Sequence, residues 1–485
     1  MLSYSNIRDY LSSKYPDHTW VLVHERSMRS VFRLDRGETP EYFVKIYDPR
    51  GLPAKLRNLL RPRTLYEADM LKRLKACSLS VPEVEDHIRL KASSALITKA
   101  VHPCRPLHEL DRNKQAEIML ETAVKLLSNN FFFSDMHMGN IVIDDYSRPY
   151  LLDAYEIKPC RVITPRHIIS LFSQVLAVYD VADDELVRAL KRVGNLHLQE
   201  DILEEIRRKA LHSRRRYVGK LVQRCLKPGI FTREIKRENY RAYVFAGNSI
   251  DLEDLLSRHE RNISGQKNVL KYQEKTQLTQ VDDYCIKTYK RPRPLCQEYA
   301  LRSWKGLLTL YFNGIGVADP VAVAMFEDKS SVLVTRMLDY PDLDCFFHSA
   351  FNNLGFRDKM GIVCSFGEMI GSMHAFNIYH ADLKACNIKI DAGAPRFYLL
   401  DTDRIEQRSS LMYAKRLKNL VQINTSIPVH ISTGMRMRFL RSYAGCTGDD
   451  FRNLFQDVWR CSSGKEILYC TPQGDHVDTW RCSRV

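Results

Sequence analysis

Residues 379–404 read YHADLKACNIKIDAGAPRFYLLDTDR, and this stretch decides the fold. It opens with a short polar loop that contains Asp382 and Asn387. Two β-rich segments, IKI and FYLL, follow the loop, and the residues between them, DAGAP, favour a turn. The second segment ends in another acid, Asp401. The stretch therefore predicts a polar loop followed by a β-hairpin that ends in a carboxylate.

The residue types in this stretch suit two interpretations. In the first, Asp382 orients a substrate hydroxyl, while Asn387 and Asp401 hold magnesium against nucleotide phosphates, as in protein-kinase-like phosphoryl transfer. In the second, the Asp and Asn residues are present because they favour turns. A single copy of the pattern leaves both interpretations open.

A second copy of the pattern lies in the first half of the chain. Residues 133–156 read FSDMHMGNIVIDDYSRPYLLDAYE. Asp135 and Asn140 have the same separation as the acid and the amide of the first stretch, and Asp153 ends the same Tyr-Leu-Leu-Asp run. The copies are about 250 residues apart, which is too far for a solenoid repeat and indicates two whole domains. The repetition favours the phosphoryl-transfer interpretation.

The length and composition are typical of a soluble protein with two or three domains. The chain has 485 residues, of which 45% are hydrophobic and 27% are charged. No apolar run approaches the roughly 18 residues of a spanning helix, and the first residues, MLSYSNIRDYLSSKYPD, are too polar for a secretory signal. The 13 Cys are scattered without a Cys-x-x-Cys pair, which favours reduced, buried thiols over zinc or disulfides. We therefore expect a cytoplasmic protein.

The net charge of +15 indicates anionic partners. Candidates are nucleotide phosphates, nucleic acid and an acidic membrane surface. A solvated helix face is the simpler explanation for any one basic cluster, but it does not easily explain the total excess. The basic residues gather at Arg207-Arg208-Lys209, Arg214-Arg215-Arg216 and Lys415-Arg416-Lys418.

The first half begins with a small β-rich lobe. Residues 20–47 alternate β-forming and polar residues and predict three antiparallel strands. Lys45 lies inside the third strand, as either an ordinary edge-strand charge or a lysine that holds ATP phosphates. The second interpretation requires a following helix with a facing glutamate, and residues 64–76 provide one with Glu67. Although Glu67 also suits a helix N-terminus, we favour an ion pair with Lys45.

The second half repeats the lysine but not the glutamate. Residues 269–289 alternate as strands, and Lys287 takes the place of the first lysine. The helix expected at about 297–311 has Ser303 where the first half has its glutamate, and Glu298, further upstream, is a candidate substitute.

The remaining pattern predicts a larger helical lobe after each small lobe. The loop HERSMRS at 24–30 lacks the glycines of a phosphate-binding loop, and the tail from about residue 445 has no clear periodicity. The fold class is therefore α+β, with two tandem protein-kinase-like domains at 1–244 and 245–485. Each has a small antiparallel β-rich lobe and a larger helical lobe.

Several segments of the second half form a recognisable pattern: SWKGLLTLYFNGIGVADPVAV, VTRML, MHAFNIYHADLKACNIKI, FYLLDTDRI, RLKNLVQINTSIP and MRFLRSYAG. They cover most of residues 285–445, and together they resemble the lipopolysaccharide kinase (Kdo/WaaP) family, which has a protein-kinase-like fold. The first half is similar to the same broad clan, including its heptose-kinase members, but more weakly. It has Phe133 in place of His380 and Ser134 in place of Ala381.

The resemblance implies phosphorylation of a sugar, heptose or Kdo, in the lipopolysaccharide inner core, with ATP and Mg2+ as cofactors. The partners would be the lipopolysaccharide core or a lipid A-core precursor and the anionic inner face of the inner membrane, with peripheral attachment and no nucleic acid. By position, the resemblance implies the catalytic acids Asp135 and Asp382, the magnesium ligands Asn140, Asp153, Asn387 and Asp401, and the ATP-binding residues Lys45, Glu67 and Lys287.

Four functional hypotheses remain open. Both domains are active kinases, or one is active and a degenerate partner positions the substrate or the membrane. A third hypothesis is a non-catalytic scaffold, which predicts erosion of the metal ligands, and the sequence shows no such erosion. A fourth is a kinase for a protein or another small molecule, such as an aminoglycoside. The missing glycine loop and the basic helices argue against an ordinary protein kinase.

Overall fold

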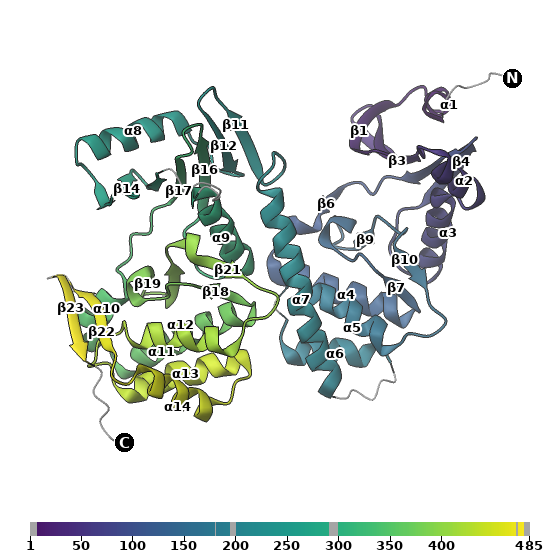
Figure 1. Ribbon diagram of the computed structural model, residues 1–485. Helices are drawn as coiled ribbons and strands as arrows, with labels where there is room; N and C mark the ends of the chain where they lie inside the picture. Colours follow the sequence, from purple (N-terminus) through teal and green to yellow (C-terminus); the bar gives the residue numbers. More distant parts are fainter. Residues whose placement is uncertain (1–6, 180, 195–199, 291–298, 472–473, 480–485) are drawn as a thin grey trace. The chain divides into compact units, whose positions relative to one another are not determined.

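The chain forms two compact units, Met1–Arg214 and Arg215–Val485, in a computed structural model (Figure 1). The division comes earlier in the chain than residue 244. Within the described part of the chain, no helix combines the length and the apolar character needed to cross a membrane. The structure describes residues 7–179, 181–194, 200–290, 299–471 and 474–479.

Unit 1 begins with a five-stranded antiparallel sheet in the order β1-β2-β3-β5-β4. Alternate strand residues such as Leu34, Val44 and Ile97 are fully buried on one face, where Leu11 of the first helix packs against them. The three strands predicted within residues 20–47 are present. The elements are α1 (Ile7–Lys14), β1 (Thr19–Arg26), β2 (Arg29–Arg36), β3 (Thr39–Tyr47), β4 (Val84–Leu90) and β5 (Ser93–Lys99).

Two helices, α2 (Leu52–Leu60) and α3 (Arg63–Ala76), connect β3 to β4. The predicted helix at 64–76 corresponds to α3, and its buried residues contact the sheet and the core of the helical lobe. That lobe contains the helices α4 (Arg112–Ser128), α5 (Pro165–Leu176), α6 (Asp183–Arg192) and α7 (Glu200–Arg224), and α7 runs past the division between the units.

The polar loop of unit 1 lies between β7 and a β-hairpin. Strands β8 and β9 pair in antiparallel register from Ile141 opposite Leu151, as the sequence predicts. The short elements here are β6 (Cys104–Pro106), η1 (Leu107–Glu109), β7 (Phe131–Phe133), η2 (Met138–Asn140), β8 (Ile141–Asp144), β9 (Pro149–Leu151) and β10 (Ile157–Pro159).

Unit 2 has a seven-stranded antiparallel sheet in the order β11-β12-β16-β17-β15-β14-β13. The run β13-β14-β15-β17-β16 repeats the strand order of the first sheet, and β12 and β11 extend the edge beside β16. The strands are β11 (Thr232–Lys236), β12 (Tyr240–Phe245), β13 (Val269–Tyr272), β14 (Thr276–Val281), β15 (Tyr284–Tyr289), β16 (Pro320–Phe326) and β17 (Ser331–Arg336).

Helices cover both faces of this sheet. Helix α8 (Leu252–Ser264) packs on one face, as Figure 1 shows, and α9 (Tyr299–Asn313) packs against the sheet within the main core. The polar loop and its hairpin follow α11, in the elements β18 (Ile378–His380), η4 (Ala385–Asn387), β19 (Ile388–Asp391), β20 (Arg396–Leu399), η5 (Thr402–Arg404) and β21 (Ile405–Gln407).

The helical lobe of unit 2 is closely packed. A Cβ added at Gly367 of α11 would lie 2.3 Å from the carbonyl oxygen of Phe439 in α13, so only glycine permits this approach. The part of the tail after residue 445 that the structure describes contains α14, in which Leu454 and Val458 form a buried face. The elements are α10 (Leu343–Ser349), η3 (Phe351–Asn353), α11 (Phe356–Ala375), α12 (Tyr413–Asn424), α13 (Thr433–Thr447), α14 (Phe451–Ser462), β22 (Glu466–Thr471) and β23 (Gly474–Thr479).

Candidate active site

His380 fixes the shape of the polar loop in unit 2. Its side chain is buried, Nε2 donates to the Leu400 carbonyl at 3.0 Å, and Nδ1 accepts from the Asp382 backbone N–H at 3.2 Å. These partners define one neutral tautomer, and burial lowers the pKa of His380. The ring therefore joins the start of the loop to the end of the hairpin.

The predicted catalytic acid and amide lie together in this loop. The Asn387 side-chain nitrogen donates to the Asp382 carbonyl at 2.9 Å, so the amide oxygen is the atom that would bind a metal. The Asp382 carboxylate is 40% exposed, and one of its oxygens lies 3.3 Å from Lys384 Nζ. An acid held on a fixed backbone and open to solvent can receive a substrate hydroxyl.

Two side chains of helix α12 bond to backbone carbonyls of the same loop. The Asn419 side chain donates to the His380 carbonyl at 2.7 Å and accepts from His374 Nε2 at 3.1 Å. Gln422 donates to the Ala381 carbonyl at 3.3 Å. The sequence interpretation assigned no role to these residues, although both lie in the segment RLKNLVQIN. Their amides, placed among apolar residues of a predicted helix, were the available signal.

Lys287 of β15 and Asp401 form an ion pair, with Nζ 2.6 Å from Oδ1. Burial disfavours the charge of Lys287, but Tyr289 and Asp401 outweigh burial and raise its pKa. Burial would also raise the pKa of Asp401, but Lys287 outweighs it and holds that pKa below its ordinary value. Both groups are therefore charged at neutral pH.

Ser303 takes a different role from the glutamate of the first half. It is buried in α9, its hydroxyl lies 2.7 Å from Thr402 Oγ1, and Thr402 donates to the Ser303 carbonyl at 3.0 Å. One turn later, a Cβ on Gly306 would lie 2.0 Å from the Thr402 carbonyl oxygen. The helix thus packs directly on the residue after Asp401. Glu298 lies outside the described residues.

In unit 1 the predicted ion pair between Lys45 and Glu67 is present, and Glu67 is buried in α3. Lys45 Nζ also donates to the Leu152 carbonyl at 2.8 Å. In unit 2 the corresponding carbonyl accepts from His380 instead. Because Phe133 cannot donate a side-chain hydrogen bond, the lysine takes the place of the histidine at this carbonyl.

Asp153 of unit 1 pairs with an arginine that the sequence interpretation missed. Arg29 Nη1 lies 3.1 Å from Asp153 Oδ2, and Arg29 begins β2, directly after the glycine-free hairpin turn. Burial would raise the pKa of Asp153, but Lys45 and Arg29 outweigh it and lower this pKa. The hairpin of β1 and β2 lacks the glycines of a phosphate-binding loop, but it supplies a cation, Arg29, beside Asp153.

Asp135 and Asn140 have the same backbone relationship as their counterparts, but the loop is more open. The Asn140 side chain donates to the Asp135 carbonyl at 3.3 Å, and the Asp135 carboxylate is 70% exposed. His137 Nε2 lies 3.7 Å from Asp135 Oδ2. The acid of unit 1 is therefore less enclosed than Asp382.

The chemistry of these donors fits magnesium and nucleotide phosphates. Each unit offers one carboxylate and one amide oxygen from Asp and Asn, which are ligand types that Mg2+ prefers, usually together with phosphate and water oxygens. Among the described residues, no group of three or more His, Cys, Asp or Glu could hold a metal by itself. The predicted residues could therefore hold the ion together with a nucleotide rather than as a closed cage.

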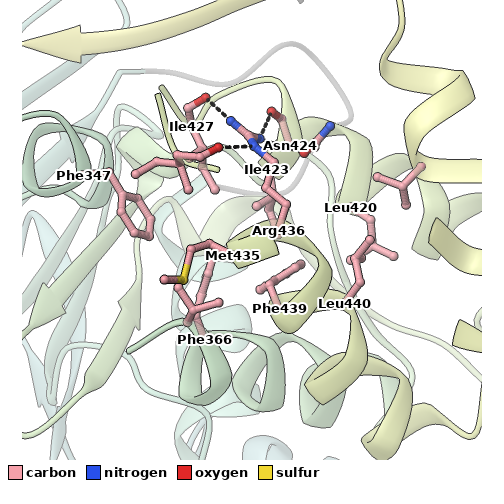
Figure 2. Close-up of a pocket in the computed structure, with 13 residues that line it drawn as sticks. Phe347, Phe366, Leu420, Ile423, Asn424, Ile427, Met435, Arg436, Phe439 and Leu440 are labelled. Atoms are coloured by element: carbon pink, nitrogen blue, oxygen red, sulfur yellow. Dashed lines mark hydrogen bonds between the residues drawn. The ribbon is translucent and has the colours of Figure 1, made fainter. Parts of the chain in front are cut away.

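A small apolar pocket lies elsewhere in the helical lobe of unit 2 (Figure 2). Arg436 extends into it from α13 and donates to the carbonyls of Ile427 at 3.1 Å and Pro428 at 2.8 Å. It also bonds Asn424 Oδ1 at 2.7 Å, and burial lowers the pKa of Arg436 to about 9. None of the predicted site residues lines this pocket, so Arg436 acts as a structural tie between α12 and α13.

Arg416, in the basic cluster Lys415-Arg416-Lys418, has a structural role. Arg416 forms a bidentate ion pair with Asp449, with contacts of 2.6 and 2.9 Å, and both side chains are largely buried. This arginine therefore contributes to packing and is a poor candidate for contact with an anionic partner.

The arrangement is that of a protein-kinase-like fold. An antiparallel sheet carries the lysine, a helix packs on the sheet, and an Asp-Asn loop precedes a hairpin that ends in Asp. Residues 252–443, which lie within unit 2, match the model of the lipopolysaccharide kinase (Kdo/WaaP) family. No curated protein matches the chain.

Several solved structures are similar to the chain. A crystal structure of WbdD has 18% sequence identity and a TM-score of 0.29, and the match covers 40% of this chain and 45% of WbdD. A structure of WbdD described as a bifunctional kinase-methyltransferase has 18% identity and a TM-score of 0.27, covering 38% and 42%. The kinase domain of PknI from Mycobacterium tuberculosis has 15% identity and a TM-score of 0.25, covering 34% and 73%.

Proposed function

We propose that the protein is an ATP- and Mg2+-dependent kinase that phosphorylates a heptose or Kdo sugar of the lipopolysaccharide inner core. The observation that carries the proposal is the pairing of Lys287 with Asp401 beside the Asp382–Asn387 loop, inside the segment that matches the family. The reaction would take place at the cytoplasmic face of the inner membrane, with the protein attached peripherally to the anionic surface.

In the proposed reaction, each of the predicted site residues of unit 2 has a separate role in phosphoryl transfer. Asp382 orients the sugar hydroxyl and accepts its proton, while Lys287 holds nucleotide phosphates. Asn387 and Asp401 would hold magnesium, which neutralises charge on the phosphates. In unit 1 the same roles fall to Asp135, Lys45 with Glu67, and Asn140 with Asp153.

Activity in both units is supported by the matching strand order of the two sheets and by the Lys45–Glu67 pair. The alternative is one active kinase with a degenerate partner that positions the substrate or the membrane. Its support is the open loop of unit 1, where Phe133 replaces the histidine and Asp135 is mostly exposed. A kinase for a protein or another small molecule is the further alternative.

The test is mass spectrometry of the lipopolysaccharide core from a strain that lacks the gene. Loss of two phosphates supports two active units, and loss of one supports a single active unit. A core with unchanged phosphorylation contradicts the proposed substrate. Magnesium-dependent ATP binding by the purified chain separates the kinase from the scaffold hypothesis, because a scaffold would not bind the nucleotide.

A further inference from the structure

Helix α2 of unit 1 carries an exposed stripe of leucines. Leu52 is 80% exposed, Leu56 57%, Leu59 42% and Leu60 74%. At about 100° per residue, these four positions fall within an arc of roughly 100° on the helix. Leucine side chains are usually buried, so four on one short solvent-facing stripe indicate a surface that is covered in use.

The opposite side of α2 is fastened to the sheet. Asn58 is 4% exposed, and its side-chain nitrogen donates to the Ala92 carbonyl at 2.7 Å and to Ser94 Oγ at 3.3 Å. Its side-chain oxygen accepts from the Arg63 backbone N–H at 3.1 Å, and Arg89 donates to the Leu59 carbonyl at 2.6 Å. The folded unit therefore sets the outward direction of the leucines.

The charge around the stripe identifies the kind of surface that it fits. Residues 49–66 contain five basic residues and no acid. Of these, Arg50, Lys55 and Arg61 are exposed, whereas the Arg63 guanidinium lies 3.5 Å from the centre of the Tyr155 ring. Leucines with cations at their margins are typical of helices that lie in the interface of an anionic bilayer.

We propose that α2 docks unit 1 on an anionic membrane, with Leu52, Leu56, Leu59 and Leu60 inserted among the lipids and Lys55 near their headgroups. This inference deepens the proposed function and rests on it, because a kinase for a membrane-embedded glycolipid has to reach the bilayer. The docking itself involves no nucleotide and can be measured separately from phosphoryl transfer.

The experiment is sedimentation of the full chain with vesicles of phosphatidylcholine and phosphatidylglycerol in equal parts, and with vesicles of phosphatidylcholine alone. The wild type should bind the anionic vesicles preferentially. L56Q/L60Q should lower the partition coefficient at least tenfold, and K55Q should lower it about fivefold, as expected for one cation at the surface. The control is L468Q/V477Q, which removes two apolar side chains that are more than half exposed from β22 and β23.

Circular dichroism of each variant checks that the exposed substitutions leave the fold intact. Wild-type binding by L56Q/L60Q, equal binding to both vesicle types, or no vesicle binding by the wild type would overturn the proposal. A wild-type dimer that L56Q/L60Q converts to a monomer, without vesicle binding, would show instead that the stripe covers a second copy. Normal docking without sugar phosphorylation would contradict only the proposed function.

Discussion

Lys287 Nζ lies 2.6 Å from Asp401 Oδ1, whereas Lys45, the corresponding lysine of unit 1, contacts Glu67 and the Leu152 carbonyl. In unit 2 the lysine predicted to hold phosphates thus neutralises the acid predicted to bind magnesium. If unit 2 binds a nucleotide as proposed, Lys287 has to exchange a carboxylate for phosphates, while Lys45 already has a separate carboxylate partner. The two units are expected to differ in nucleotide affinity for this reason.

Replacement of Asp401 by asparagine should make Lys287 more reactive. Burial lowers the pKa of Lys287, whereas Tyr289 and the Asp401 carboxylate raise it. Because the variant lacks this carboxylate, the pKa of the Lys287 amine should fall. Acylation of Lys287 at mildly alkaline pH, followed by peptide mass spectrometry, should be faster in the variant. Lys45 is the internal control because it keeps Glu67. An unchanged ratio of labelling between the two lysines would contradict the importance of this pair.

Asp382→Asn should lower phosphate transfer by unit 2 about 10²- to 10⁴-fold, because asparagine cannot accept the hydroxyl proton. Asp135→Asn makes the same prediction for unit 1. The purified full chain, with lipopolysaccharide core and labelled ATP, provides the assay. Asp391→Asn is the control, since Asp391 ends β19 and caps the hairpin turn by accepting from the Gly393 N–H. If Asp382→Asn and Asp391→Asn have equal activities, Asp382 is not the catalytic acid.

Asn419→Leu should make the backbone of the Asp382–Asn387 loop more mobile without changing any residue of the loop itself. The substitution removes the 2.7 Å bond to the His380 carbonyl and leaves buried polar groups unpaired, at a cost of about 1–3 kcal/mol. Hydrogen exchange at residues 378–388 should become faster, and the turnover number should fall more than the affinity for ATP. Gln422→Leu, which removes a longer 3.3 Å bond, should have a smaller effect. Equal protection in the wild type and both variants would contradict this role.

Gly306→Ala should destabilise unit 2 by about 1–3 kcal/mol, because its Cβ would overlap the Thr402 carbonyl oxygen. The matched substitution is Gly361→Ala in α11, where an added Cβ meets nothing within 4 Å. That variant should gain about 0.5–1 kcal/mol from the better helix propensity of alanine. Thermal unfolding should therefore shift in opposite directions for the two variants, and parallel shifts would refute the steric argument.

Acidification should destabilise unit 2 through His374. Burial lowers the pKa of this histidine from 6.5 to about 4, and its contacts are Tyr443 and Asn419, with Arg416 and Asp449 as the charged neighbours. Between these pH values the unfolded chain binds a proton that the folded chain does not. The stability that His374 contributes is therefore present above its ordinary pKa and is lost as the pH falls toward 4.

The expected loss for His374 between about pH 7 and about pH 5 is about 2 kcal/mol, because ~1.4 kcal/mol is lost per pH unit below the ordinary pKa of 6.5. Thermal unfolding at about pH 7 and about pH 5 measures it. His374→Leu should show a weaker dependence on pH, whereas His137→Gln, at an exposed position, should match the wild type. A variant at His374 with wild-type pH dependence would assign the effect to other groups.

The features predictable from the sequence were those set by local spacing. The interval from Asp382 to Asn387 and the alternating strands after it depend on neighbouring residues, and the structure has the predicted loop and hairpin. The Lys45–Glu67 pair was also predictable, because β3 and α3 are close together in the chain and such elements have few ways to pack. The roles of these residues in catalysis remain predictions.

Contacts between distant segments were not predictable in the same way. Asn419 reaches the His380 carbonyl across the helical lobe, and a pattern of apolar residues does not indicate the partner of one amide. Arginine side chains are usually exposed, yet the guanidinium of Arg436 is buried among carbonyls. Likewise, the leucines of α2 resemble core residues in sequence, but they are exposed because the opposite side of the helix, at Asn58, is bonded to the sheet.

The pairing of β12 with β16 has a practical consequence for work with separate pieces of the chain. Tyr240 to Val244 form a ladder with Phe326 to Ala322, and Ala242 and Val244 are buried beneath α8. A recombinant fragment that starts at residue 245 would lose this strand and leave β16 with an unpaired apolar edge, which is a template for aggregation. A fragment that starts at Arg215 keeps the strand and is the better choice for expression.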